Sequence, residues 1–202
     1  HIDAQLKDPK LHNAPSLLSS QLEAGLSMDA IRANIKLAIS GGQNEPRDAI
    51  AGTIGTLLEN HSQLESIISG SKTWLQAFEE YSRWMSPIGM SPRRIAKNFI
   101  YKDVEFYEND MIFFMFGSAN RDEAIFQNPD YFDISRDNGP SISFGAGPHF
   151  CAGAWISKTL IAEVALPLFF SHFSNLYLKK PIEFQGWAFR GPKEVILVNR
   201  NK

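Results

Sequence analysis

The chain has 202 residues, of which 44% are hydrophobic and 21% are charged, and its formal net charge at pH 7 is -2. This composition is typical of a globular protein with a substantial core and argues against intrinsic disorder. The charge is small and the basic residues are scattered, which argues against nucleic acid as a partner. Glu163 and Pro167 interrupt the longest apolar stretch, so no membrane span is expected. The scarcity of cysteine fits a reducing compartment, and we expect a cytoplasmic protein.

Helical periodicity dominates the sequence up to about Met85. Ser27 is a plausible N-cap for a helix whose apolar positions recur at helical spacing from residue 28 to residue 59. Pro46 lies inside this stretch and has no N–H to donate to the carbonyl of Gly42. The pattern therefore predicts either one long kinked helix or two helices joined by a break. A further helix is predicted from about residue 72 to residue 84.

Beyond Met85 the pattern changes to short strands, turns and one more helix. Strands are predicted at residues 94–99, 104–107 and 111–115, a turn-rich segment at 117–140, a helix at 152–166, and short strands near 176–178 and 195–198. The predicted fold class is therefore mainly α with small β-sheets (α+β).

The single cysteine, Cys151, lies in the stretch SFGAGPHFCAG at residues 143–153. One cysteine excludes a disulfide within the chain, and the paired short spacings of a zinc site are absent. Three roles stay open: a buried inert thiol, a catalytic nucleophile, or the single protein ligand of an iron cofactor. The loop runs into the predicted helix, where free N–H groups and the helix dipole would stabilise a thiolate.

The residues around the thiol favour the iron ligand over the nucleophile. His149 is the nearest candidate base, but residues two apart do not face each other on a helix, and no orienting acid accompanies it. For an iron cofactor, Phe144 can shield the sulfur from water and Gly147 allows a tight turn. Gly153 lets a flat macrocycle approach the helix closely.

In the order F-x-x-G-x-H-x-C-x-G, Phe144, Gly147, His149, Cys151 and Gly153 resemble the cysteine-ligand loop of the cytochrome P450 haem-thiolate monooxygenases. Further segments resemble the family and occur in the family's order. Residues Glu80 to Arg83 resemble its E-x-x-R helix, and residues Ala119 to Arg136 resemble its A-N-R-D…F…P-D-x-F-D…R stretch. Residues Phe189 to Gly191 resemble a late strand pair. The resemblance implies a P450-like fold in which a long distal helix and a proximal cysteine-loop helix sandwich the haem. Family members are longer, so residues 1–202 resemble the C-terminal part of a single haem-thiolate domain.

The resemblance also implies residue roles. Cys151 would bind the iron of haem b (iron protoporphyrin IX), and Phe144, Gly147 and Gly153 would shape its site. Arg94 and His149 would hold the propionates, although each also reads as an ordinary surface residue. Glu80 and Arg83 would form a buried network with Arg136 that braces the haem loop. The alternative is a solvated pair three residues apart, worth about 0.2–0.5 kcal/mol.

The chain departs from the family at the distal helix, where the usual pattern is A/G-G-x-D/E-T. The sequence reads Gly41, Gly42, Gln43, Asn44, Glu45, Pro46, so Asn44 stands in the place of the acid and Glu45 in the place of the alcohol. Both are candidate catalytic residues. Glu45 could act as acid and base on peroxide, or relay protons through water in a dioxygen reaction. The alternative is that it faces solvent or pairs with Arg47.

The resemblance implies a monooxygenase that inserts an oxygen atom into a small, hydrophobic organic substrate. Electrons would come from a ferredoxin or a flavin reductase, and Lys158 would be a candidate docking contact for this donor. Alternatively, hydrogen peroxide would replace both dioxygen and the electron donor. The alternatives are a peroxide-using peroxygenase and a non-catalytic haem-binding relative. A cysteine-dependent hydrolase that uses Cys151 and His149 is a weaker alternative.

Overall fold

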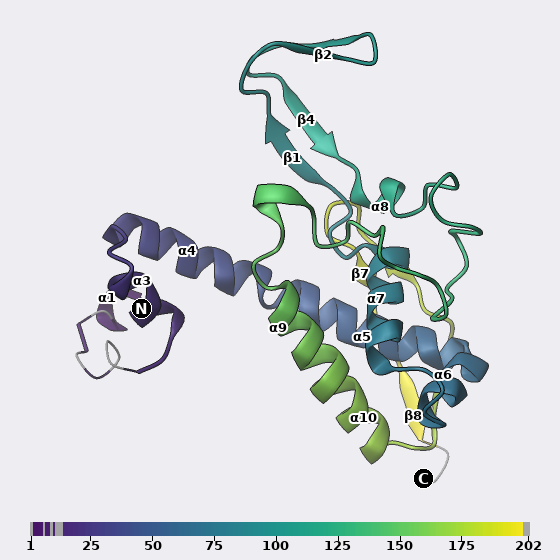
Figure 1. Cartoon of the computed structure of the whole chain (residues 1–202). Helices are drawn as coiled ribbons and strands as arrows, with labels where there is room; N and C mark the ends of the chain where they lie inside the picture. The colour runs from purple at the N-terminus through teal and green to yellow at the C-terminus, as the bar shows by residue number, and fades with distance from the viewer. Residues whose placement is uncertain (1, 6, 9, 11–13, 200–202) are drawn as a thin grey trace. The chain divides into compact units, whose positions relative to one another are not determined.

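Figure 1 shows the computed structural model of the chain, which describes residues 2–5, 7–8, 10 and 14–199. The chain divides into two compact units, His1–Asn44 and Glu45–Lys202. The first unit contains α1 (Ile2–Gln5), α3 (Leu17–Glu23) and α4 (Met28–Gly41). Ser27 caps α4 as predicted, because its hydroxyl accepts the N–H of Ala30 at 3.3 Å. The Asn34 amide donates to Gln21 at 2.8 Å and thereby ties α4 to α3.

The helical pattern predicted for residues 28–59 forms two helices. The second, α5, spans Asn44–Glu59, and the break falls at Gly42 and Gln43. A Cβ on Gly42 would lie 2.6 Å from the carbonyl oxygen of Ala38, so the turn requires a residue without a side chain. Pro46 lies in the first turn of α5, where a missing N–H removes no helical hydrogen bond.

The second unit has a helical core made by α5, α6 (His61–Ile68), α7 (Trp74–Met85) and a long helix near the C-terminus. Helix α6 was not predicted from the sequence; it is short and buries Leu64 and Ile67. The predicted helix at 72–84 is confirmed as α7, and a capping box between Thr73 and Gln76 fixes its start. The fully buried Leu57, Phe78 and Leu166 join these helices in one apolar cluster.

The C-terminal helix extends further than predicted. It consists of α9 (Ala154–Lys158), a π-helical segment η2 (Thr159–Ala165) and α10 (Leu166–His172). Pro167 does not end it, because the hydrogen-bond register changes in η2 and Pro167 occupies the first turn of the register that follows. By length and composition this helix is sufficient to cross a membrane, which corrects the prediction that no such stretch exists. Ile161, Ala162 and Leu166 bury one side of it in the apolar cluster.

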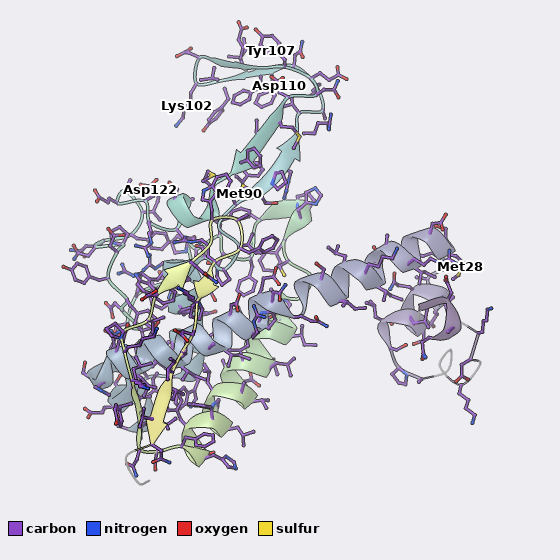
Figure 2. All side chains as sticks on the ribbon, turned by 180° about the vertical axis from the view of Figure 1, so that it is seen from behind. Met28, Met90, Lys102, Tyr107, Asp110 and Asp122 are labelled. Carbon is purple, nitrogen blue, oxygen red and sulfur yellow. The ribbon has the colours of Figure 1, made fainter. Side chains whose placement is uncertain are left out.

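In the described residues the strands form antiparallel pairs. The pairs are β1 (Ser91–Arg94) with β4 (Met111–Phe114), β2 (Phe99–Tyr101) with β3 (Val104–Phe106), β5 (Leu176–Leu178) with β8 (Leu197–Asn199), and β6 (Phe184–Gln185) with β7 (Gly191–Pro192). Figure 2 shows Lys102, Tyr107 and Asp110 at and beside the β2–β3 hairpin, away from the helices of this unit.

Among the strand predictions, the strand at residues 94–99 is the one that differs most from the structure. β1 instead ends at Arg94, and β2 starts at Phe99. Ile95 still exchanges backbone hydrogen bonds of 2.9 Å with Asp110 and Asn109, so the chain leaves the ladder only after Ile95. The segment predicted as turn-rich at 117–140 is largely irregular, apart from the short helix α8 (Phe116–Ala119) at its start.

Candidate functional site

The cysteine loop, residues 143–151, is closed by its own backbone. The Cys151 N–H donates to the carbonyl oxygen of Phe144 at 2.8 Å, and the N–H of Gly145 donates to Ile142 at 2.8 Å. Gly145 and Gly147 have φ angles of 74° and 64°, in the left-handed region that favours glycine. Gly147 therefore makes the predicted tight turn. In Figure 1 the loop lies between the base of the β1–β4 hairpin and the start of α9.

Cys151 is exposed at the point where the loop enters α9. Its carbonyl accepts the N–H of Ala154 at 3.2 Å, and Gly153 is the N-cap residue of the helix. A Cβ on Gly153 would lie 3.8 Å from the sulfur, in ordinary contact distance. Gly153 therefore keeps the space beside the thiol open, as its predicted role requires, and the exposed thiol excludes the reading of a buried inert cysteine.

Phe144 is half-buried behind the loop and anchors it to the helical core. Its ring meets the buried ring of Phe78 edge to face, with 6.2 Å between the centroids. The Nζ atom of Lys158, the last residue of α9, lies 5.9 Å from the centroid of the same ring. The loop is thus fixed against both α7 and α9 through one aromatic side chain.

Glu80 and Arg83 form the buried pair that the resemblance implies, and the reading of a solvated surface pair is wrong. Arg83 donates through Nε and Nη2 to the two carboxylate oxygens of Glu80, each at 2.8 Å, and both side chains are 0% exposed. Arg136 joins them with its Nε 3.3 Å from Glu80 Oε1. Arg83 Nη1 also donates to the carbonyls of Asn120 and Pro129 at 2.8 and 3.0 Å.

Asn120 connects this network to the cysteine loop. It is 0% exposed, and its Oδ1 accepts the N–H of Ile142 at 2.9 Å. Its Nδ2 donates to Ser143 Oγ at 3.1 Å, and that hydroxyl donates to the carbonyl of Ser82 in α7 at 2.8 Å. Asn120 belongs to the stretch that resembles the family, but no role was predicted for it. The signal available in the sequence was its place in the A-N-R-D pattern.

Arg94 and His149 stand at the two places where the resemblance expects the propionate contacts. Arg94 is exposed at the end of β1, opposite Met111 in the ladder. His149 is exposed in the 3₁₀ turn η1 (Gly147–His149) of the cysteine loop. Both side chains are therefore accessible to a ligand, and their predicted role in propionate binding stays a prediction.

The two candidate distal residues differ in their surroundings. Asn44 is exposed, whereas Glu45 is half-buried. Glu45 Oε2 is inaccessible to water and has no hydrogen-bond partner among the described residues. Arg47 donates through Nε to Asp48 at 2.8 Å, so the alternative in which Arg47 pairs with Glu45 is not what the structure shows. Asn44 is the last residue of the first unit, and Glu45 is the first residue of the second.

The chemistry of the loop fits a haem. Within the described residues, no three side chains of the types His, Cys, Asp and Glu converge as a metal-binding group. A bare metal ion at the loop would therefore find little beyond one thiol, whereas a haem supplies its own four nitrogen ligands and needs one axial ligand. Cys151 and the neighbouring Phe150 are both exposed, and Gly153 leaves the sulfur uncovered. These residues offer a thiol beside an apolar face.

Fold and loop together define a mainly helical protein whose single thiol is presented on a glycine-rich loop. The family model described as "Cytochrome P450" matches residues 75–194. The chain belongs to the cytochrome P450 family. This match runs through the apolar helix of α9, η2 and α10, and so assigns it to the family fold.

Relatives with curated names agree with this assignment. A "Cytochrome P450" of Bacillus subtilis (strain 168) is 31% identical over 93% of this chain and 47% of the relative. The "Steroid C26-monooxygenase" of Mycolicibacterium smegmatis is 31% identical over 70% of this chain and 36% of its own. The chain thus spans about half the length, or less, of these relatives.

Solved structures confirm the predicted P450-like fold. P450BioI in complex with hexadec-9Z-enoic acid ligated acyl carrier protein aligns with a TM-score of 0.87 and 26% identity, over 98% of this chain and 52% of that one. Cytochrome P450 CREJ in complex with (4-ethylphenyl) dihydrogen phosphate aligns with a TM-score of 0.85 and 28% identity, over the same shares of the two chains, 98% and 52%.

Proposed function

We propose that the protein containing this chain is a haem-thiolate monooxygenase that inserts one oxygen atom into a small, hydrophobic organic substrate. The observation that carries the proposal is the cysteine loop. Its backbone is closed, its sulfur is uncovered, and it is fixed to α7 through Asn120 and Phe144. Membership of the cytochrome P450 family supports a haem at this loop.

In this proposal Cys151 would bind haem b, and the surrounding residues would hold the sulfur in place. A haem bound through a thiolate supplies the activation of dioxygen or peroxide, because the thiolate favours cleavage of the O–O bond. Phe144 excludes water behind the sulfur, and Gly153 admits the macrocycle. Arg94 and His149 hold the propionates, where positive charge or hydrogen-bond donors offset the two carboxylates.

The oxidant determines whether the protein needs an electron donor. With dioxygen, one oxygen atom enters the substrate and the other leaves as water, which consumes two protons and two electrons from a ferredoxin or a flavin reductase. With hydrogen peroxide, the oxidant carries both electrons and the same products form without a reductase. A relative named as a monooxygenase, the "Steroid C26-monooxygenase", favours the first source.

A specific observation keeps the peroxygenase as the second candidate function. Glu45 stands where the family pattern has an alcohol, and its Oε2 is buried without a partner. A carboxylate can take a proton from one oxygen of hydrogen peroxide and return it to the other, whereas a threonine hydroxyl is too weak a base for this transfer. We propose that the carboxylate of Glu45 carries this proton, or relays protons when dioxygen is the oxidant.

The hydrophobic substrate class rests on the relatives. The names of these proteins and complexes refer to a steroid, to hexadec-9Z-enoic acid on an acyl carrier protein, and to (4-ethylphenyl) dihydrogen phosphate. Each of these molecules presents an apolar body. An apolar body lowers its free energy by leaving water for a largely apolar pocket.

The first experiment is the absorption spectrum of the haem-loaded protein after reduction and exposure to carbon monoxide. We expect a strongly red-shifted Soret band, and loss of that band in Cys151→Ser. An unshifted band in the unaltered protein would overturn Cys151 as the thiolate ligand. Turnover of apolar substrates with either a reductase system or hydrogen peroxide then separates the enzyme from a non-catalytic haem-binding relative, which would bind haem and show no turnover.

A further inference from the structure

Lys158 points its charge inward, although it lies at an exposed stretch of α9. Its Nζ atom lies 2.6 Å from Oε1 of Glu79 in α7, and the two side chains are only 28% and 30% exposed. The same atom lies 5.9 Å from the ring centroid of Phe144 and 5.7 Å from that of Trp155. The ammonium is therefore held between one carboxylate and two aromatic rings.

This arrangement holds the Lys158 ammonium in one position, whereas the ammonium of a surface lysine normally moves in solvent. An ammonium on a flexible stem is strongly hydrated, so a single surface partner seldom holds it in one place. Here the carboxylate of Glu79 and the two ring faces attract it together, and partial burial reduces screening by water. Glu79 is adjacent in sequence to Phe78, whose ring packs edge to face with that of Phe144. Two neighbouring residues of α7 thus act on Phe144, one directly and one through Lys158.

Phe144 passes this constraint on to the thiol. Its carbonyl oxygen accepts the Cys151 N–H at 2.8 Å, so the position of Phe144 sets the backbone that carries the sulfur. We propose that Lys158 and Glu79 form a positioning pair that holds Phe144 and thereby the Cys151 loop. We propose further that the fixed ammonium raises the reduction potential of the haem. The second statement rests on the proposed function, whereas the first does not require a haem.

The inference differs from a role of Lys158 in docking an electron donor. A docking lysine needs its charge free for a partner's carboxylates, and its loss changes the rate of encounter. A positioning lysine changes properties of the isolated protein. Every measurement below is therefore made without an electron-transfer partner.

The first measurement is hydrogen exchange of the Cys151 amide in the protein as isolated. Lys158→Met keeps most of the apolar stem and removes the charge, and Glu79→Gln keeps the shape and removes the partner. We expect both variants to exchange this amide several-fold faster than the unaltered protein, and Lys158→Arg to restore slow exchange. Lys180→Met is the matched control, because Lys180 pairs with Glu194 at an exposed site outside the loop and α9. Unchanged exchange in Lys158→Met would overturn the positioning role.

The second measurement is the midpoint potential of the haem in the same variants, by spectroelectrochemical titration. A distant charge effect predicts opposite shifts, since one variant removes a positive charge and the other a negative charge. The positioning pair instead predicts a lower midpoint potential in both Lys158→Met and Glu79→Gln, because each variant loses the fixed ammonium. It also predicts that the midpoint potential of the double variant is no lower than that of Lys158→Met. Opposite or additive shifts would overturn this part. If the protein binds no haem, the proposed function fails and amide exchange alone decides the positioning role.

Discussion

Glu80 and Arg83 form a bidentate ion pair that is fully enclosed, with both side chains 0% exposed and both hydrogen bonds at 2.8 Å. Removing one partner from a buried pair leaves an uncompensated charge, which typically costs about 3–5 kcal/mol. Arg83 also donates to the carbonyls of Asn120 and Pro129, next to the segment that leads to the cysteine loop. The pair therefore supports the loop as well as the core.

We expect Arg83→Met to lower the free energy of unfolding by about 3–5 kcal/mol, measured by denaturant titration. Arg83→Lys should also destabilise the protein, because an ammonium cannot reproduce two parallel hydrogen bonds. Lys180→Met is the control, since its pair with Glu194 is exposed and water screens it, so its loss should change stability little. A loss in Arg83→Met no larger than that of the control would contradict the buried network.

Asn120→Ala should loosen the connection between α7 and the cysteine loop. Its Oδ1 accepts the Ile142 N–H, and its Nδ2 donates to Ser86 and Ser143, so the substitution leaves the Ile142 N–H without its acceptor and takes one donor from each of the two hydroxyls. We expect a loss of about 1–3 kcal/mol of stability. We also expect weaker haem retention, measured as haem content after gel filtration. Retention equal to that of the unaltered protein would show that the loop does not depend on this bridge.

Gly147→Ala tests whether the loop needs its left-handed residue. The φ angle of Gly147 is 64° and open space surrounds its Cβ position, so the cost is conformational, about 1–2 kcal/mol. Gly147→Asn should lose less, because asparagine tolerates this conformation. Gly153→Ala is the matched comparison: its φ is -88°, so stability should hold while the added methyl group beside the sulfur lowers haem occupancy. Thermal unfolding and haem titration of the three variants measure these differences.

How much of this could be read from the sequence depends on how far apart the contacting residues lie. The cysteine loop, α7 and the turn after Gly42 follow from local chemistry, and a family pattern placed Glu80 and Arg83 together. The bridge from Asn120 joins residues 34 and 22 positions away, and the Lys158–Glu79 pair spans 79 positions. The periodicity of apolar residues contains no information about contacts between residues so far apart in the sequence. The π-helical register that carries the chain past Pro167 was likewise hidden, because a proline by itself predicts the end of a helix.

Tyr81 makes stability sensitive to alkaline pH. Burial raises the pKa of its phenol well above the ordinary value of 10.0, and the nearby Asp48 acts in the same direction. The unfolded chain therefore ionises this phenol first. The contribution of Tyr81 is present below pH 10.0 and is lost as the pH rises from there toward the folded pKa. We expect Tyr81→Phe to unfold with a smaller loss of stability above that pH, in paired denaturant titrations. Parallel pH profiles would contradict this expectation.

Glu45→Gln tests the proton transfer proposed for the distal carboxyl. The substitution keeps the size of the side chain and removes its ability to take and return a proton, so peroxide-driven oxidation should fall about 10²–10⁴-fold. Haem content should change little, because Glu45 lies on α5 and the proposed ligand lies on the cysteine loop. Asp48→Asn is the control, as it removes a neighbouring carboxylate that already accepts a hydrogen bond from Arg47. Equal peroxide-driven rates in Glu45→Gln and the unaltered protein would exclude an acid–base role for Glu45. A fall confined to the reductase-driven reaction would instead assign Glu45 to proton relay from water.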